Sequence, residues 1–278
     1  MADRHRGTLS LRVLGVNVRI QCEEARTQAL LKAHYGWMQW PLDTADLTYT
    51  IARQNGTWLF AGDREELWRA SDAGEVLLGL DQDLIIQLQR RRSDLYFIHA
   101  GVLEFSGKAF MLVAPSGGGK STLVWGLVHH GLRYLSDELA PVDLRTLTVH
   151  PYPRAVTLKS VPPRPYPLPR GTLSTSRGFH VTAATLASGS RATTAPVAAI
   201  CFLRYTPEAL RPSIERISAA QAGARLYANA LNALAHPEEG LDGAIHIART
   251  TACFDVATAE LAATCALVKA TWERLLRS

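Results

Sequence analysis

One stretch, FMLVAPSGGGKSTL at residues 110–123, constrains the fold of this chain more than any other part of it. It reads as a short apolar strand, a glycine-rich turn and the start of a helix, which is the order of elements in a phosphate-binding loop. Ala114, Gly119, Lys120 and Ser121 match the Walker A pattern, with Ala in place of the usual first Gly. The stretch therefore predicts an α/β fold organised around a nucleotide site.

Each residue type in this loop has a chemical reason to be there. Glycines let the backbone curl so that several N–H groups face phosphate oxygens, and the following helix adds the positive end of its dipole. Lys120 is expected to reach the β- and γ-phosphates, and the Ser121 hydroxyl to ligate Mg²⁺. The predicted nucleotide-binding residues are Ser116, Gly117, Gly118, Gly119, Lys120, Ser121 and Thr122. The alternative is a glycine-rich turn with a chance Lys-Ser pair.

Composition narrows the classes of partner. The 278 residues are 47% hydrophobic, enough for a full core in one large domain or in one domain with an appendage. The net charge of +5 comes from interspersed Lys, Arg, Asp and Glu, so an ordinary solvated surface is favoured over a nucleic-acid face. Four widely spaced cysteines and the lack of a long apolar segment indicate a reducing cytoplasm and no membrane association.

The chain is expected to divide near residue 72. Alternating apolar runs at 8–20, 46–53 and 57–61 predict a β-rich N-terminal unit, either a scaffold or a substrate-recognition face, in residues 1–72. Residues 73–278 form the predicted catalytic domain. Within it, residues 160–196 carry many Pro, Ser and Thr, so they are predicted to form a mobile loop or lid.

Helical spacing over 73–93 predicts a helix, and LYFIHAGVLEF at 95–105 predicts one strand before the loop. After the loop helix, a short apolar strand ends in the carboxylate pair Asp137-Glu138. Carboxylates at a strand end beside a phosphate loop can hold Mg²⁺ or activate a nucleophile, whereas the plain alternative is an exposed acidic turn. A further helix is predicted from Ser218 to about Ala235, with Ser218 and Gln221 as a capping box.

The block from residue 98 to residue 143 resembles the catalytic core of the HPr kinase/phosphorylase family. It is more similar to the HPr-kinase-related kinases encoded beside PqqD-like genes or in lasso-peptide clusters. The resemblance is carried by His99-Ala100 before the hairpin, by the hairpin that leads into the loop, by the Gly131–Glu138 segment, and by PYPRAVTLK at 151–159.

This resemblance implies ATP-dependent phosphoryl transfer to a hydroxyl, usually that of a serine, on a mixed-sheet core similar to the nucleotide-binding core of phosphoenolpyruvate carboxykinase. By position, the resemblance implies that Asp137 is the base that takes the proton of the acceptor hydroxyl. It also implies that Ser121, Asp137 and Glu138 lie near the metal and that His99 lies near the phosphates. Arg154 matches an arginine that would stabilise transferred charge. Without the resemblance, His99 would be interpreted as a core histidine.

The expected acceptor is a serine of a peptide or protein, such as a lasso-type precursor. The alternatives are a small acidic or hydroxylated metabolite as acceptor, a nucleotide-binding partner protein without catalysis, and, from fold analogy alone, a small-molecule carboxykinase. The signature by which HPr kinases recognise HPr is not visible, so HPr is not the expected substrate. Members of the family tend to assemble, which leaves a homo-oligomer open.

Overall fold

The computed structural model describes residues 7–62, 67–186, 193–206 and 208–277. The fold is of the mixed α/β type, and the chain divides into two compact units. The first unit comprises residues 1–92, 154–161 and 168–185, and the second comprises residues 93–153, 162–167 and 186–278. None of the helices in the described ranges combines the length and apolar character that crossing a bilayer requires.

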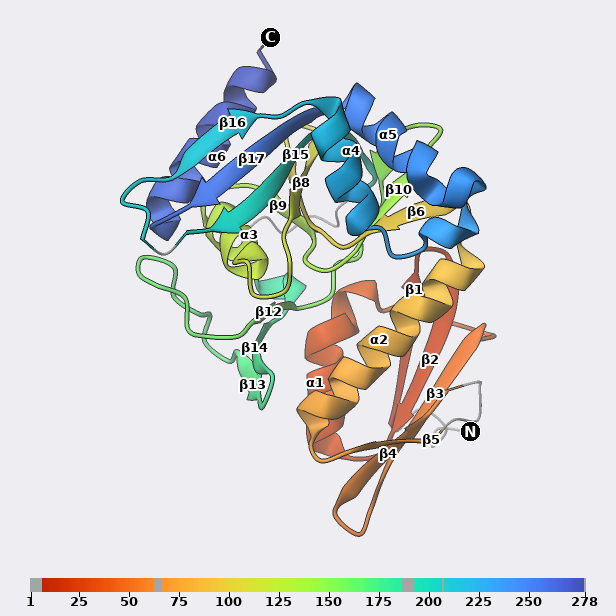
Figure 1. The fold of residues 1–278 in the computed structure, drawn as a ribbon. Helices are drawn as coiled ribbons and strands as arrows, with labels where there is room; N and C mark the ends of the chain where they lie inside the picture. The colour runs from red at the N-terminus through yellow and green to blue at the C-terminus, as the bar shows by residue number, and fades with distance from the viewer. Residues whose placement is uncertain (1–6, 63–66, 187–192, 207, 278) are drawn as a thin grey trace. The chain divides into compact units, whose positions relative to one another are not determined.

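The first unit is built on a five-stranded sheet with helices packed against it (Figure 1). Its strands alternate buried and less buried side chains, because one face of the sheet packs on the helices. The strands in sheet order are β1 (Thr8–Val13), β2 (Val16–Cys22), β3 (Leu47–Gln54), β4 (Thr57–Ala61) and β5 (Leu67–Ala70). The helices are α1 (Ala25–Tyr35), η1 (Gly36–Met38) and α2 (Ala73–Arg91).

A second small sheet also belongs to the first unit, although its residues come from the middle of the chain. It consists of β12 (Val156–Leu158), β14 (Gly178–Val181) and β13 (Leu173–Thr175), followed by η2 (Ala183–Thr185). The expected boundary after residue 72 therefore differs from the division seen here. α2 packs on β4 and β5, because its buried apolar stripe needs their core, and β14 of the small sheet contacts α1.

The predicted mobile loop at 160–196 contains this regular structure, so its description as one open loop needs correction. β14 pairs with β12 and β13, and these pairings satisfy main-chain polar groups within the predicted loop. Tyr166 is buried against the second unit's own helix, where its carbonyl accepts a hydrogen bond from Trp125 Nε1 at 3.1 Å. Residues 187–192 lie outside the described part of the chain.

The second unit is built on a nine-stranded mixed sheet (Figure 1). Its main path runs β6 (Leu95–Ile98), β10 (Ala140–Asp143), β11 (Thr148–Val149), β15 (Ala195–Tyr205), β8 (Lys108–Val113), β7 (Gly101–Phe105) and β9 (Arg133–Ser136). β17 (Ala252–Thr258) pairs with β15, and β16 (Ser213–Arg216) pairs with β17. β15 is parallel to both β8 and β17, whereas the other described pairings of this sheet are antiparallel.

Helices cover both faces of this sheet. One face buries Ile200 and Phe202 with the apolar sides of α4 (Ala219–Ala228) and α5 (Leu241–Thr250). The other face packs on α3 (Lys120–His129) and α6 (Leu261–Leu275), where Phe110 stacks on Trp272 at 4.3 Å between ring centroids. Between α4 and α5 lie the short turns η3 (Ala233–Ala235) and η4 (Pro237–Gly240).

Two predicted elements of this unit differ from what the structure shows. The strand predicted over 95–105 is broken into β6 and β7 at His99, because the His99 backbone N–H donates to the carbonyl of Asn229 at 2.9 Å. The helix predicted from 218 to 235 ends at Ala228, although the Ser218–Gln221 capping box is present as predicted.

Candidate functional site

The loop between β8 and α3 has the glycine-dependent backbone that the motif predicts. Gly117 and Gly119 both have φ of +83°, a left-handed conformation that side-chain-bearing residues rarely adopt. The Gly118 N–H donates to the Pro115 carbonyl at 2.9 Å and closes the turn. Gly119 is the N-cap of α3 and has no side chain to accept from the first amides of the helix. Those amides are therefore suited to an anion.

Ala114 can replace the usual first glycine because the crowding at this point is relieved by another residue. A Cβ added at Gly118 would lie 3.0 Å from the Ala114 Cβ, which is closer than side chains normally pack. With glycine at position 118, the Ala114 methyl has room, and Ala114 is buried at the end of β8. The departure from the motif at position 114 thus leaves the loop intact.

Lys120 joins three of the residues predicted from sequence. Its buried side chain places Nζ 2.7 Å from His99 Nε2, 2.9 Å from the Asp137 backbone carbonyl and 3.8 Å from Glu138 Oε2. An ammonium group can only donate, so His99 Nε2 is the acceptor and the neutral imidazole carries its proton on Nδ1. That Nδ1 lies 3.3 Å from Glu138 Oε1, which is an acceptor. The contacts agree on one protonation pattern for His99.

The two carboxylates sit in different surroundings although they are neighbours in sequence. β9 ends at Ser136, whose hydroxyl accepts from the backbone N–H groups of Leu139 at 3.1 Å and Glu138 at 3.4 Å and so shapes the turn. Asp137 is 0% exposed, whereas the Glu138 side chain is 31% exposed. Glu138 is therefore the carboxylate that a molecule arriving from solvent could touch.

Gly101 brings β7 close to α3 and was not identified from the sequence. A Cβ at this position would lie 2.6 Å from Val124 Cγ2 and 3.4 Å from Lys120 Cγ. The strand that follows His99 can approach the loop helix only because this residue has no side chain. A glycine inside a predicted strand, as in HAGVLEF, is the signal that could have pointed to such a close approach.

Ser121 and Thr122 follow Lys120 in the first turn of α3, and both are half-buried. Among the described residues, no group of three or more His, Cys, Asp or Glu side chains could hold a metal by itself. Mg²⁺ is commonly bound by one or two protein oxygens together with phosphate oxygens and water. The Ser121 hydroxyl and the Glu138 carboxylate are oxygen donors of this kind, so the residues fit a nucleotide-borne Mg²⁺.

Arg154 lies in the first unit, whereas the loop, His99 and the acid pair lie in the second. It is buried, and its Nη1 contacts Asp81 Oδ2 and His34 Nε2, each at 3.3 Å, and Thr157 Oγ1 at 3.2 Å. The structure thus places Arg154 in a buried cluster of the first unit. Its expected part in stabilising transferred charge stays a prediction.

Comparisons with known proteins add little to this geometry. No protein-family model matches the chain, and no curated protein matches it. Thirty-seven chains of solved structures do match. One is the HPr(Ser) kinase/phosphatase from Coxiella burnetii, with 15% sequence identity, a TM-score of 0.27, and coverage of 44% of this chain and 76% of that chain. A structural likeness at this level carries no weight for fold or function.

Proposed function

We propose that the second unit is a phosphotransferase that uses ATP with Mg²⁺ and transfers the γ-phosphoryl group to a hydroxyl. The observation that carries this proposal is the meeting of Lys120, His99 and Glu138 beside the glycine-rich loop. Phosphoryl transfer needs positioning and charge stabilisation more than covalent participation by the protein. A loop that can bind phosphates, a buried cation and a partly exposed carboxylate supply these functions.

In the proposed reaction the acceptor oxygen forms a bond to the γ-phosphorus while the bond from that phosphorus to the β–γ bridging oxygen breaks. ADP leaves with the electron pair of the broken bond, and a carboxylate takes the proton of the acceptor hydroxyl. The metal supplies charge neutralisation on the phosphate oxygens when it is bound. Lys120 places positive charge next to the same oxygens, and His99 holds both the Lys120 ammonium and the Glu138 carboxylate in position.

The resemblance implies Asp137 as the base. Asp137 is buried and Glu138 is partly exposed, so the two residues could have different roles in the reaction. Asp137 contributes its backbone carbonyl to Lys120, while the more exposed Glu138 carboxylate faces the side open to solvent. We therefore propose that one of these two carboxylates accepts the proton, and that comparing their amide variants assigns the role. Arg154 is retained as a candidate for charge stabilisation.

The proposed acceptor is a serine of a peptide or protein, as the sequence resemblance implies. The test incubates the purified chain with γ-labelled ATP, Mg²⁺ and a panel of serine-bearing peptides and small hydroxy acids, with mass spectrometry to locate the added phosphate. We expect phosphate on a serine side chain. Phosphate on a small molecule would replace the peptide acceptor, and nucleotide binding without transfer to any acceptor would indicate a non-catalytic binding protein.

Asp137→Asn is the informative variant in that assay. Under the proposal in which Asp137 is the base, it should bind ATP as the unaltered chain does and lose acceptor-dependent ADP formation. Lys108→Ala is the control, because Lys108 is an exposed lysine at the start of β8, at the other end of that strand from the loop. If Asp137→Asn leaves acceptor-dependent ADP formation intact, the base is not Asp137.

A further inference from the structure

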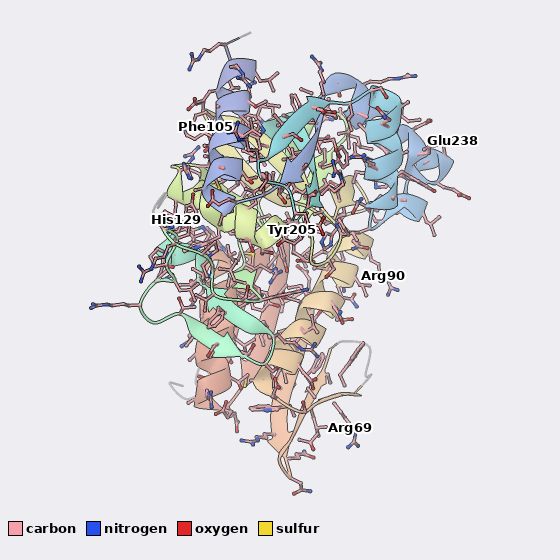
Figure 2. All side chains as sticks on the ribbon, turned by 60° about the vertical axis from the view of Figure 1, so that its left-hand side comes forward. Arg69, Arg90, Phe105, His129, Tyr205 and Glu238 are labelled. Atoms are coloured by element: carbon pink, nitrogen blue, oxygen red, sulfur yellow. The ribbon has the colours of Figure 1, made fainter. Side chains whose placement is uncertain are left out.

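β15 extends past the end of the strand that carries the loop. The two strands are parallel, and their register pairs Phe202 with Val113, the last residue of β8. β15 then continues through Leu203 and Arg204 to Tyr205, while the β8 chain turns into the loop. Because parallel strands end at the same edge of a sheet, Tyr205 lies at the loop edge. Phe105, the last residue of β7, pairs with Lys108 at the other end of β8, and Figure 2 shows Phe105 and Tyr205 apart.

Tyr205 is also on the face of the sheet that carries the loop helix. Ala199 is paired with Phe110, whose ring stacks on Trp272 of α6, which places Ala199 and Cys201 on the α6 face. Side chains two residues apart share a face, so Tyr205 follows Cys201 onto that face. α3 packs beside α6 there, since a Cβ added at Gly126 would lie 2.6 Å from Cys265 Sγ.

The groups that would act on the γ-phosphate all come from the other side of β8. The sheet order is β9, β7, β8, β15 and β17, so His99 before β7 and Asp137-Glu138 after β9 stand on the β7–β9 side of the loop. If the reacting end of the nucleotide lies on that side, its nucleoside end leaves the loop on the β15 side. Tyr205 ends the first strand on that side.

The side chains next to Tyr205 are engaged elsewhere. Arg204 alternates onto the opposite face, where its Nη2 lies 3.4 Å from Asp255 Oδ2, and Asp255 also pairs with Arg225 at 2.6 Å. Thr258, at the end of β17, is buried, and its hydroxyl contacts the Arg204 carbonyl at 3.5 Å. Tyr205 is 60% exposed, so its ring is accessible to a ligand from solvent.

We propose that Tyr205 is a nucleotide-binding residue whose ring stacks on the base of the bound nucleotide. An aromatic face accepts a planar base without a hydrogen-bonding pattern, which agrees with the lack of a base-reading motif in the sequence. The site then holds the nucleotide at two points, the phosphates at the loop and the base at the end of β15. The inference rests on the proposed function, because it requires the loop to hold the phosphates.

The experiment compares two ligands that differ by the nucleoside. Isothermal titration with Mg·ATP and with Mg·tripolyphosphate is carried out on the full chain, Tyr205→Ala, Tyr205→Phe and Tyr227→Ala. Tyr227 is the matched control, since it is a partly exposed tyrosine on α4, which covers the opposite face. Tyr205→Ala should weaken ATP binding about tenfold and leave tripolyphosphate binding unchanged, whereas Tyr205→Phe and Tyr227→Ala should bind both ligands normally.

Two results would overturn the stacking role while leaving the proposed function in place. One is unchanged ATP affinity in Tyr205→Ala, and the other is an equal loss of affinity for ATP and tripolyphosphate. If the unaltered chain binds neither ligand, the proposed function itself fails, and the stacking role fails with it. Thermal unfolding followed by circular dichroism, with an unchanged midpoint for Tyr205→Ala, shows that any difference in affinity is not a folding defect.

Discussion

Lys120 donates a hydrogen bond from Nζ to His99 Nε2 at 2.7 Å, and this contact joins the loop helix to the break between β6 and β7. It links residues that are 21 positions apart in the chain and draws Glu138 into the same cluster through His99 Nδ1. Removing the ammonium group takes away a donor from His99 and from the Asp137 carbonyl at once. The nucleotide site therefore depends on Lys120 both for its charge and for its internal order.

Lys120→Ala should lower ATP affinity by roughly tenfold to a hundredfold, because charged hydrogen bonds contribute about 1.5–3 kcal/mol each. Isothermal titration with Mg·ATP measures the effect. Lys108→Ala, which removes an exposed lysine at the start of β8, should bind ATP normally. Equal affinities for the two variants would show that Lys120 does not contact the phosphates.

Glu138→Gln should reduce the transfer rate by about 10²- to 10⁴-fold if its carboxylate takes the acceptor proton. ATP affinity should change far less, since the amide keeps an oxygen and nearly the same shape. Rates are measured by labelled-phosphate transfer at saturating ATP, alongside Asp137→Asn. If only Asp137→Asn loses activity, Glu138 holds its neighbours and does not take the proton.

Gly101→Ala should destabilise the second unit by about 1–3 kcal/mol, because the new methyl group would overlap Val124 Cγ2 at 2.6 Å. The displaced helix start should also weaken ATP binding. Gly223→Ala is the control within the same unit, because Gly223 lies inside α4 and a Cβ there would meet its nearest neighbour, Ile245 of α5, at an ordinary 3.6 Å. Denaturant unfolding should show that variant to be neutral or more stable, and a Gly101→Ala midpoint like that of Gly223→Ala would contradict the close approach.

Asp81→Asn should cost about 3–5 kcal/mol of unfolding free energy, because it removes a buried charge that balances Arg154. Asp81 also accepts from the Tyr35 hydroxyl at 2.5 Å and lies 2.9 Å from His34 Nε2. Denaturant unfolding compares Asp81→Asn with Glu75→Gln on the same helix, whose solvent-exposed pair with Arg177 should contribute far less to stability. Adding Arg154→Met to Asp81→Asn should recover part of the loss. Equal costs for the two single variants would argue against a stabilising cluster.

The same cluster should make the first unit less stable in mild acid. Burial, helped by the nearby positive charges, lowers the pKa of His180 from 6.5 to about 4. Burial also lowers the pKa of His34. Between pH 6.5 and about 4, His180 binds a proton in the unfolded chain but not in the folded one. The contribution of His180 to folding stability is therefore present above pH 6.5 and is lost as the pH falls toward 4. The full shift corresponds to about 3 kcal/mol.

Asp81 works in the same direction at lower pH. Burial raises the pKa of its carboxyl, but attraction to His34 and Arg154 and hydrogen bonds from His34 and Tyr35 outweigh burial and bring it to about 2. Its contribution is present above pH 3.8 and is lost toward pH 2.

Thermal unfolding across pH 4 to 8 measures how stability depends on pH in the range where His180 titrates, and His180→Gln should make that dependence weaker. An unchanged slope in that variant would assign the pH dependence to other groups.

Much of the local structure could be predicted from the sequence. Alternation predicts β1 to β4, and β3 is joined to β4 through Asn55 and Gly56, which both have positive φ. Helical spacing predicts α2, and the loop motif predicts the passage from β8 to α3. These features depend on residues close together in the chain, so their periodicity and turn chemistry are visible without knowledge of the fold.

Other features depended on partners far along the chain. Asp81 lies in the buried stripe of α2. Its charge there is balanced by Arg154, which comes from a segment 73 residues later in the chain. The different exposures of Asp137 and Glu138 depend on how β9 packs in the sheet, which the local sequence does not reveal. Position alone assigned Arg154 to the predicted kinase domain, whereas its buried charge is balanced within the first unit.

By itself, the sequence determined a glycine-rich loop between a buried strand and a helix, with a histidine before it and two acids after it. The tertiary structure decided which of these side chains meet, because β7 and β9 pair beside β8 and bring His99 and Glu138 to Lys120. It also decided that β15 passes the end of β8 and places Tyr205 at the loop edge. Local patterns specify elements, whereas strand pairing between distant segments specifies the site.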